Sequence, residues 1–411
     1  MNILFVHEVD WLNKVVFDVH SLSEYLSLLG HRVFAIDYES TWQRDGLNLG
    51  SLRTKEFDGI SRAFSGASVC LRRPGFIKIP GLSRMSAAFT HYQEIKKTIK
   101  DRNIDAIMLY SVPTNGLQTT YLARKFHIPV LFRSMDTLNQ LVPIPALQQP
   151  TKLLERKVYS KVDMILTLTP RLSQYAINLG AEESRVRVLP FPVDTNLFHP
   201  GIDCSKIRHK WGIADSEQVI LYMGTLFDFS GLDGFIRLFP QILEQVPRAK
   251  LLVVGDGPQR TKLEELITKL ELGEKVIITG LQPYETMPQY INLANICLLP
   301  FLITDATRDI FPGKVAQYLV CARAVISTPL PGLVALISGE GQGVVYVSSA
   351  DEMLKQVVSL LKTSERRRNL ERAGLNYAKQ VHSCEKIAHQ LELSLEETIK
   401  EKRDGTTSKR I

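Results

Sequence analysis

The sequence predicts an α/β protein made of two doubly wound domains, each with a parallel sheet covered by helices. Short apolar runs bounded by turns alternate with helical patterns, and this alternation favours a parallel sheet buried on both faces. The same rhythm restarts after residues 188–201 (VLPFPVDTNLFHPG), a proline-rich stretch with neither periodicity. The chain of 411 residues is long enough for two domains of about 200 residues each. Two such domains place their strand ends, and therefore their ligand sites, on either side of one cleft.

The elements of the first domain follow one another in a regular order. Residues 2–7 (NILFVH) are typical of a strand, and the helical pattern over 15–30 ends at Gly30, a common helix C-terminal signal. Further strands are predicted at 31–38, 105–111, 128–134 and 162–169, and further helices at 88–100, 116–126 and 150–161. We expect this domain to cover residues 1–190.

The second domain repeats the pattern after the linker. Its buried strands are predicted at 218–224, 249–255, 275–280, 296–301 and 324–328, with helices between them. We expect this domain to cover residues 191–385, followed by a C-terminal helix and polar tail over 386–411.

The positive net charge of the chain favours an anionic partner. The formal net charge is +7 and the isoelectric point is near 9.0, which suits nucleic acid, a membrane surface or a phosphorylated substrate. Positive charges crowd one segment that has few acids: Arg53, Lys55, Arg62, Arg72, Arg73, Lys78 and Arg84. Residues 76–89 mix apolar and basic side chains, which suits contact with an anionic membrane. The alternative is an exposed basic loop that leads into a core-facing helix.

Cysteine usage and the amino terminus indicate a cytoplasmic protein, which could act at the inner face of the membrane. The five cysteines are scattered without a C-x-x-C pair, which argues for a reducing compartment and against both zinc and disulfides. The first residues lack a basic region followed by a long apolar stretch, and no apolar run is long enough to span a bilayer. We therefore expect neither export nor a membrane span.

The chain is organised around residues 309–319 (DIFPGKVAQYL), which follow the apolar run 296–302. This segment is predicted to be a loop at the carboxyl edge of the sheet that opens into a helix, with Pro312, Gly313 and Lys314 early in it. Backbone amides, the positive end of the helix dipole and the lysine charge would together favour a phosphate.

Two polar residues flank this predicted phosphate site. Gln317 lies one helical turn after Lys314 and Asp309 lies in the loop ahead of it, so both can reach the same edge. The alternative is an ordinary helix start whose lysine and glutamine are merely solvated.

Glycines follow three other strands of the second domain. The turn at 224–231 (GTLFDFSG) begins with Gly224, and the motif GDGP contributes Gly255 and Gly257. Gly280 ends the next strand. Each is a place where backbone can approach a ligand closely, although a G-x-G pattern alone is common.

The order of these motifs, more than any one of them, resembles the retaining, nucleotide-sugar-dependent glycosyltransferases of family four. The resemblance covers nearly the whole chain, from NILFV and LSLLGHRV through LLVVGDGP and VIITG to INLANICLLPF, with the linker pattern V-D-x-x-x-F-x-P at Val193, Asp194, Phe198 and Pro200. It implies the GT-B architecture, in which two Rossmann-like domains face each other across a cleft.

The resemblance implies roles around segment 309–319. Asp309 falls where the family has a glutamate that holds hydroxyls of the transferred sugar near the reacting face. Phe311 and Pro312 fall where an aromatic residue and a glycine present their backbone to the donor. Gln317 falls where a second glutamate binds the ribose hydroxyls. Aspartate and glutamine both keep an acceptor oxygen, so hydrogen bonding to hydroxyls survives both substitutions.

The turn at 224–231 departs from the family pattern. Thr225 and Ser230 stand where similar enzymes have an arginine and a lysine that clamp the diphosphate. Because stabilising the charge of the departing diphosphate is a large catalytic contribution, another cation must substitute. The candidates, in order, are Lys314, Arg308 and Lys14. Asn13 and Lys14 correspond to the family's paired glycines, in a first-domain loop that touches the donor phosphates; a solvated lysine is the alternative.

The first domain is expected to bind the acceptor. Glu8 and Asp10 end its first strand, where carboxylates could bind acceptor hydroxyls or a cation. The chain has no D-x-D motif and the fold usually needs no metal, so we favour hydrogen bonding and expect no metal site. Arg133 and Asp136 occupy the region where related enzymes carry a functional histidine or aspartate. Asp136 could instead cap the following helix.

The resemblance implies sugar transfer from a nucleotide diphosphate sugar with retention at the anomeric carbon, without metal or cofactor. The departing diphosphate would take the acceptor proton, and the protein would supply positioning and charge stabilisation. The acceptor would be a glycan, a lipid-linked molecule or a small molecule, and we expect no nucleic acid partner. One alternative is a catalytically impaired homologue that binds nucleotide sugar as a partner protein. Others are an epimerase, or a phosphorylase, whose pyridoxal-phosphate lysine signature we cannot identify.

Overall fold

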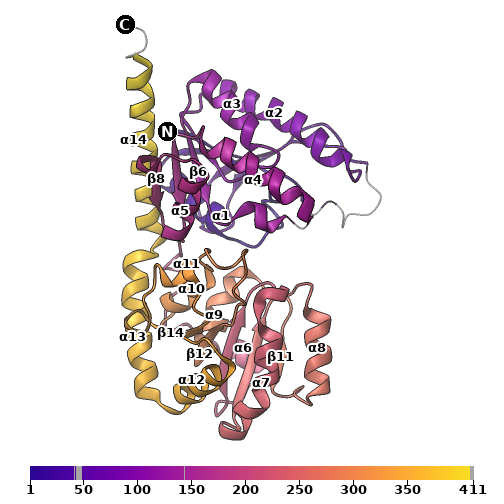
Figure 1. Ribbon diagram of the computed structural model, residues 1–411, viewed down its shortest axis with the longest axis vertical. Helices are drawn as coiled ribbons and strands as arrows, with labels where there is room; N and C mark the ends of the chain where they lie inside the picture. Colours follow the sequence, from indigo (N-terminus) through magenta and orange to yellow (C-terminus); the bar gives the residue numbers. More distant parts are fainter. Residues whose placement is uncertain (41, 43–48, 143, 408–411) are drawn as a thin grey trace. The chain divides into compact units, whose positions relative to one another are not determined.

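The computed structural model describes residues 1–40, 42, 49–142 and 144–407, and these form two compact units (Figure 1). Unit 1 comprises Met1–Pro192 together with the chain from Cys384 onward, and unit 2 comprises Val193–Ser383. The chain thus leaves unit 1 after Pro192 and returns to it at Cys384. The last helix, which we expected as a separate C-terminal piece, packs as part of unit 1.

Unit 1 is built on an eight-stranded sheet in the order β3-β4-β2-β1-β5-β6-β7-β8. Every neighbouring pair is parallel except β3 and β4, which are antiparallel. The strands are β1 (Asn2–Val6), β2 (Arg32–Ile36), β3 (Lys55–Ile60), β4 (Val69–Arg73), β5 (Ala106–Leu109), β6 (Val130–Ser134), β7 (Met164–Thr167) and β8 (Val186–Val188).

Helices cover both faces of this sheet. They are α1 (Asp18–Leu28), α2 (Leu82–Arg102), α3 (Gly116–Phe126), α4 (Pro145–Tyr159), α5 (Pro170–Asn178) and α14 (Cys384–Thr407), with short 3-10 turns η2 (Leu138–Leu141) and η3 (Glu183–Arg185). Alternate residues of β1 point to opposite faces. Leu4 and Val6 join a buried cluster with α2, α3 and α4. Ile3 and Phe5 join another with α1 and α14.

The helix α14, yellow in Figure 1, runs alongside β8 and is fixed to unit 1 by apolar packing and ion pairs. Its apolar side chains Ile387, Leu391, Leu395 and Ile399 are buried in the cluster with α1. Four ion pairs flank this stripe: Arg187–Glu397, Lys402–Asp163, His31–Glu392 and Arg403–Asp105. The helix is therefore part of the core of unit 1.

Unit 2 has a six-stranded sheet in the order β11-β10-β9-β12-β13-β14, and all its pairs are parallel. Its strands are β9 (Gln218–Met223), β10 (Ala249–Val254), β11 (Val276–Ile278), β12 (Ile296–Leu299), β13 (Ala324–Ser327) and β14 (Val344–Tyr346). The reversal of strand order on either side of β9 is the topology at which doubly wound sheets bind ligands beyond the carboxyl ends of their strands.

The helices of unit 2 alternate with its strands. They are α6 (Ser205–Lys210), α7 (Leu232–Gln245), α8 (Arg260–Lys269), α9 (Met287–Leu293), α10 (Lys314–Val320), α11 (Pro331–Val334), α12 (Ala350–Lys362) and α13 (Ser364–Val381), with 3-10 turns η4 (Asp228–Ser230), η5 (Tyr284–Thr286) and η6 (Glu340–Gln342). The helix predicted to include Pro312 and Gly313 begins at Lys314, with Gly313 as its N-cap. No helix in the described part of the chain is long and apolar enough to cross a membrane.

Candidate functional site

The turns that follow β9, β10 and β11 lie together at the carboxyl edge of the unit 2 sheet. The amide of Gly224 donates to the carbonyl of Val254 at 2.8 Å, and the amide of Gly255 donates to the carbonyl of Gly280 at 3.1 Å. The structure therefore brings together three of the glycines that the sequence singled out.

Neighbouring protein atoms exclude a side chain at three of the glycines that the sequence singled out. A Cβ on Gly224, whose φ is +138°, would lie 2.3 Å from Nζ of Lys314. A Cβ on Gly255, whose φ is +149°, would lie 2.0 Å from the Gly224 carbonyl oxygen. A Cβ on Gly257 would lie 2.7 Å from the backbone nitrogen of Leu226. The structure shows that the protein's own atoms leave no room for a side chain at these glycines. That their backbone contacts a ligand stays a prediction.

The ammonium of Lys314 occupies an aromatic environment beside Gly224. Nζ lies 4.3 Å from the ring centroid of Tyr222 and 4.7 Å from that of Phe301. It donates a hydrogen bond of 3.3 Å to the Tyr222 hydroxyl. Burial lowers the pKa of Lys314 to about 7. In the described part of the chain no ion pair joins Lys314 to a carboxylate, so its charge is left for another partner.

The loop ahead of α10 turns its apolar side chains inward. Phe311 is 3% exposed and stacks on His382 with ring centroids 5.0 Å apart, and Pro312 is also buried. Asp309 and Gln317 are partly exposed, on the loop and on α10 respectively. Asp309 and Gln317, which are near Lys314 in sequence, therefore keep exposed polar surface, whereas Phe311 packs in the interior.

Three other predicted donor residues differ in exposure. Thr225 is exposed, and its carbonyl accepts a hydrogen bond of 3.1 Å from the Tyr222 hydroxyl. Arg308 is exposed and lies 3.6 Å from Asp305. Ser230 is only 3% exposed, because η4 folds its side chain into the interior. This burial gives the predicted donor contact of Ser230 no support.

In unit 1, Asp136 follows β6 at the carboxyl edge of the sheet. Burial raises the pKa of this carboxyl to about 6, and the nearby charge of Lys14 opposes the shift. Among the described residues it has no hydrogen-bonding partner. The capping alternative is wrong, because the N-caps of η2 and α4 are Thr137 and Ile144. An unpaired, partly exposed carboxylate near a lysine is a candidate for binding a hydroxyl.

Arg133, the other residue predicted beside Asp136, is fully engaged inside unit 1. Its guanidinium donates to Asp18 Oδ2 at 2.6 Å, to the Leu189 carbonyl at 2.6 Å and to the Pro190 carbonyl at 3.1 Å. The residue is 1% exposed. These contacts correct its predicted catalytic role, because a side chain with no exposed surface joins β6 to α1 and to the chain after β8.

Glu8 is already satisfied within the protein. Its Oε1 accepts hydrogen bonds from the amides of Thr114 at 2.8 Å and Asn115 at 2.7 Å. Its Oε2 pairs with Arg84 at 3.0 Å. The carboxylate therefore fixes the turn after β5, and its predicted acceptor contact has no free oxygen to rely on.

Asp10 organises the loop after β1. Its Oδ1 accepts from the amides of Leu12 at 3.1 Å and Asn13 at 3.0 Å, and from Arg73 at 2.7 Å. The Asn13 side chain donates to Oδ2 at 3.0 Å. Asp10 thus holds the loop rather than a ligand, and the exposed side chain of Lys14 is presented by that loop.

Buried histidines complete the interior behind this edge. His7 packs against Phe17 and Tyr110, and burial lowers the pKa of His7 to about 3. Burial also lowers the pKa of His20 to about 4. Both rings are neutral at physiological pH and serve packing.

The crowded basic segment is largely neutralised by acids that lie far away in sequence. Arg72 pairs with Glu94 at 2.6 Å, Arg73 with Asp37, Lys78 with Glu39 at 2.9 Å and Arg84 with Glu8 at 3.0 Å. Arg72 and Arg73 are buried in β4. Within segment 76–89, Phe76 is buried, but Leu82, Met85 and Phe89 are exposed.

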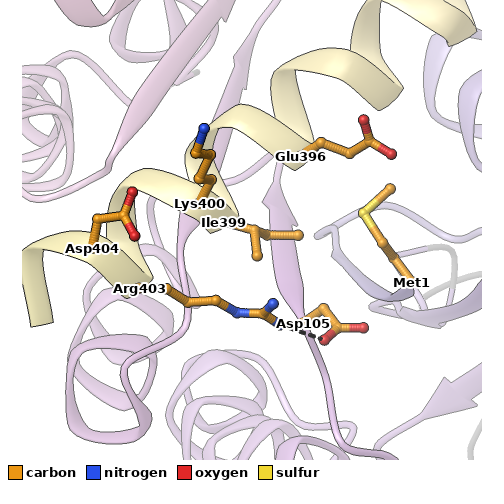
Figure 2. Close-up of a pocket in the computed structure, with 7 residues that line it drawn as sticks. All are labelled: Met1, Asp105, Glu396, Ile399, Lys400, Arg403 and Asp404. Carbon is orange, nitrogen blue, oxygen red and sulfur yellow. Dashed lines mark ion pairs between the residues drawn. The ribbon is translucent and has the colours of Figure 1, made fainter. Parts of the chain in front are cut away.

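A hollow of about 430 Å³ lies at the amino edge of the unit 1 sheet, and Figure 2 draws the residues that line it. Its lining residues are Met1, Asp105, Glu396, Ile399, Lys400, Arg403 and Asp404. It lies where β1 and β5 begin, whereas ligands of doubly wound sheets bind where strands end. The pair Arg403–Asp105, at 3.6 Å, shows that this hollow belongs to the attachment of α14.

Sequence reasoning missed the two rings around Lys314. Tyr222 precedes Lys314 by 92 positions and lies in an apolar strand, where it resembles any core residue. Phe301 ends an apolar run. The one available signal was that both positions precede predicted turns at the carboxyl edge of the sheet.

Family models match both halves of the chain. The family described as "Glycosyl transferases group 1" matches residues 203–377, and the "Glycosyl transferase 4-like domain" matches residues 16–192.

Curated relatives agree with these matches over part of their length. The chain is 24% identical over 205 residues to N-acetyl-alpha-D-glucosaminyl L-malate synthase of Bacillus anthracis, covering 49% of this chain and 51% of that protein. It is 24% identical over 314 residues to alpha-monoglucosyldiacylglycerol synthase of Streptococcus pneumoniae, covering 72% and 69%. The chain spans about half the length of the first of these relatives.

Solved structures match over nearly the whole chain. Sucrose-phosphate synthase from Thermosynechococcus elongatus superposes with a TM-score of 0.73 at 17% identity, covering 97% of this chain and 99% of that one. Anabaena HepE in complex with UDP gives 0.71 at 14% identity, covering 97% and 100%. At these identities the likeness establishes the fold, which is GT-B.

Proposed function

The chain belongs to the group 1 glycosyl transferases, and from this premise we propose that it transfers a sugar from a nucleotide diphosphate sugar to a hydroxyl of its acceptor. Two family domains in order and a GT-B fold support this proposal. The two relatives are named as synthases of a glucosaminyl malate and of a glucosyl diacylglycerol, which supports the same reaction class.

One observation carries the assignment of the donor site. Lys314 is a half-buried lysine that has no carboxylate partner among the described residues, and it lies against Gly224 at the carboxyl edge of the unit 2 sheet. Isolated buried charge is costly unless it is paired. A diphosphate would supply the missing negative charge, so we place the donor diphosphate at Lys314. Lys314 then takes the role of the two cations that are absent at Thr225 and Ser230.

We propose that transfer retains the configuration of the anomeric carbon and needs no metal or further cofactor. The bond from the anomeric carbon to the diphosphate oxygen breaks, and a bond to the acceptor oxygen forms on the same face. The acceptor proton passes to the departing diphosphate oxygen. Lys314 stabilises the charge that develops there, while Asp309 and Gln317 hold sugar and ribose hydroxyls.

Asp136 would act on the acceptor. In the described residues this carboxylate at the edge of unit 1 has no hydrogen-bonding partner, whereas Glu8 and Asp10 are occupied. Its lone pairs can accept a hydrogen bond from an acceptor hydroxyl and orient it.

We further propose that the acceptor is reached at an anionic membrane. Leu82, Met85 and Phe89 are 47%, 71% and 63% exposed, and their spacing of three and four residues places them on one side of α2. Exposed apolar side chains on a helix that also carries lysines suit a lipid surface. The Streptococcus pneumoniae relative is a synthase named for a diacylglycerol glycolipid.

Sedimentation with liposomes tests this membrane contact. The double variant Met85→Ser and Phe89→Ser should bind vesicles of anionic phospholipid at least about threefold more weakly than the wild-type chain. Leu393→Ser on α14, where the side chain is 63% exposed, is the matched control and should bind normally. Equal sedimentation with neutral and anionic vesicles would refute the contact.

Donor consumption tests the function itself. A panel of UDP, GDP, ADP and dTDP sugars is incubated with the protein and a membrane extract, and release of nucleoside diphosphate is followed. We expect one donor to be consumed in an acceptor-dependent way. Thermal stabilisation by a donor that is never consumed would favour the alternative, a nucleotide-sugar-binding partner protein.

A further inference from the structure

We propose that Tyr222 and Phe301 form an aromatic cage that positions the ammonium of Lys314 for the donor diphosphate. This inference rests on the proposed function and adds two positioning residues to it. The three side chains come from separate elements: the end of β9, the loop after β12 and the first residue of α10.

The geometry of the cage leaves the ammonium little freedom. Nζ of Lys314 faces the Tyr222 ring at 4.3 Å and the Phe301 ring at 4.7 Å, both within the range of a cation–π contact. The ammonium also donates to the Tyr222 hydroxyl at 3.3 Å. Gly224 closes another side, where a Cβ would be 2.3 Å from Nζ. The cage therefore fixes a long, flexible side chain in one place.

The hydroxyl of Tyr222 is itself held in position. It donates to the Thr225 carbonyl at 3.1 Å, which leaves its oxygen lone pairs to accept from Lys314. Thr225 stands where related enzymes were expected to have an arginine. At this position the backbone, rather than a charged side chain, supports the cation.

The same turn supports the other wall of the cage. Phe229 meets Phe301 edge-to-face with centroids 5.4 Å apart, and Phe227 stacks on Phe229 at 5.0 Å. The Phe229 carbonyl accepts a hydrogen bond of 2.9 Å from the amide of Leu302. The turn at 224–231 carries no cation of its own. Its two phenylalanine rings instead support Phe301, which contacts the ammonium of Lys314.

The charge balance of the cage indicates what completes it. Ring faces attract a cation but carry no net negative charge, so they do not neutralise the ammonium. No carboxylate is paired with Lys314 in the described residues. Among the described residues, the hydrogen-bonding partner of Nζ is the neutral Tyr222 hydroxyl. An anion with its oxygens near Gly224 would complete the coordination, and the donor diphosphate is the anion that the proposed reaction brings.

Ligand binding by two cage variants tests the inference. Affinities are measured by calorimetry for the tightest binder among UDP, GDP, ADP and dTDP, and for the matching nucleoside. Phe301→Leu should weaken diphosphate binding about three- to tenfold and leave nucleoside binding unchanged. Phe301→Tyr keeps a ring and should restore the affinity. Phe239→Leu, a buried phenylalanine of α7 outside the cage, is the control and should bind like the wild type.

Tyr222→Phe provides a second variant that keeps the volume of the core. It removes only the hydroxyl that accepts from Lys314, and we expect diphosphate affinity to fall by about two- to fivefold with nucleoside affinity intact. If the wild type binds a diphosphate and both variants bind it equally well, the cage is wrong and the proposed function stands. If none of the four diphosphates binds the wild type, the proposed function fails and the cage fails with it.

Discussion

Two ionisable residues, Lys314 and Asp136, each lie at the carboxyl edge of a sheet, and burial disfavours the charged form of both. The pKa of Lys314 is lowered to about 7 and that of Asp136 is raised to about 6. Perturbed groups of this kind gather at functional sites, because a ligand can supply the partner that the protein withholds. Each shift has a measurable consequence.

Binding of a nucleoside diphosphate should be coupled to proton uptake by Lys314. With a pKa of about 7, the free amine is mostly neutral at pH 8, and a bound diphosphate would raise the pKa and favour the ammonium. Calorimetry at pH 8 in two buffers of different ionisation enthalpy should show uptake of roughly 0.5–1 proton. Lys314→Met should bind more weakly and without this uptake. The same uptake in that variant would assign the proton elsewhere.

Asp136→Asn should stabilise the protein while it lowers activity. A carboxyl whose pKa is raised in the fold destabilises the native state at pH values above that pKa, and the penalty vanishes below its unfolded value of 3.8. Urea unfolding at pH 8 should therefore show a gain of roughly 1–3 kcal/mol that disappears near pH 4.

The control for this prediction is Asp215→Asn, because the Asp215 side chain is 96% exposed. It should leave stability within about 0.5 kcal/mol at both pH values. A loss of stability at pH 8 for Asp136→Asn would show that Asp136 serves the fold, and not the acceptor.

At the scale of elements, the chain carrying Asp136 is held by a buried hydrogen-bond cluster. Glu155 of α4 is fully buried and accepts from the Asn139 side chain at 2.8 Å and from the Tyr175 hydroxyl at 3.0 Å. Asn139 lies in η2, which begins at Leu138, two residues after Asp136. The cluster thus connects α4 and α5 to the turn that presents the candidate acceptor residue.

Tyr175→Phe should weaken this connection. Removing the hydroxyl leaves the Glu155 carboxylate with one partner fewer, so the free energy of unfolding should fall by about 1 kcal/mol. Tyr121→Phe on α3, where the ring is 57% exposed, should change it by less than about 0.5 kcal/mol. Urea unfolding followed by circular dichroism compares the two; equal stability would mean that the cluster contributes nothing to the fold.

The sequence predicted the strands that are buried on both faces. β5, β6 and β12 appear as short apolar runs because every residue in them is buried. β3, β4, β8 and β14 were missed, and each differs from this pattern. β3 is mostly exposed, and β4 ends in two arginines whose acid partners Asp37 and Glu94 are 36 and 22 residues away. Sequence periodicity cannot show a pairing of that range.

The candidate site was predicted in the same partial way. Lys314 and Asp136 were found because they follow predicted strands of a doubly wound sheet, where ligands bind. Glu8 and Asp10 satisfied the same rule, yet their oxygens are taken by the amides of their own turns. Which carboxylate remains available depends on tertiary hydrogen bonds, and the sequence does not display these.

At the scale of the whole molecule, the chain crosses from unit 1 to unit 2 and returns, so the fold of unit 1 requires both ends of the sequence. α14 contributes four buried apolar side chains to the core next to α1. At about 1.5–3 kcal/mol for each, their loss approaches the entire stability of a typical domain. The two units should therefore respond differently to truncation.

Ending the chain after Ser383 should abolish cooperative folding of unit 1 and leave unit 2 folded. Calorimetric unfolding should lose the transition of unit 1, and limited proteolysis should leave a resistant fragment that begins near Val193. Leu393→Ala, at an exposed position of α14, is the control and should keep both transitions. A truncated chain that unfolds like the full-length protein would show that α14 is an appendage.

Turnover of nucleotide sugar by the wild type and by Lys314→Met tests the account most directly. With the panel of UDP, GDP, ADP and dTDP sugars and a membrane extract as the source of acceptor, the wild type should consume one donor. The variant should do so at least about a hundredfold more slowly, because the departing diphosphate loses its cation. Equal rates for the two proteins, or binding of donors with no consumption by the wild type, would contradict it.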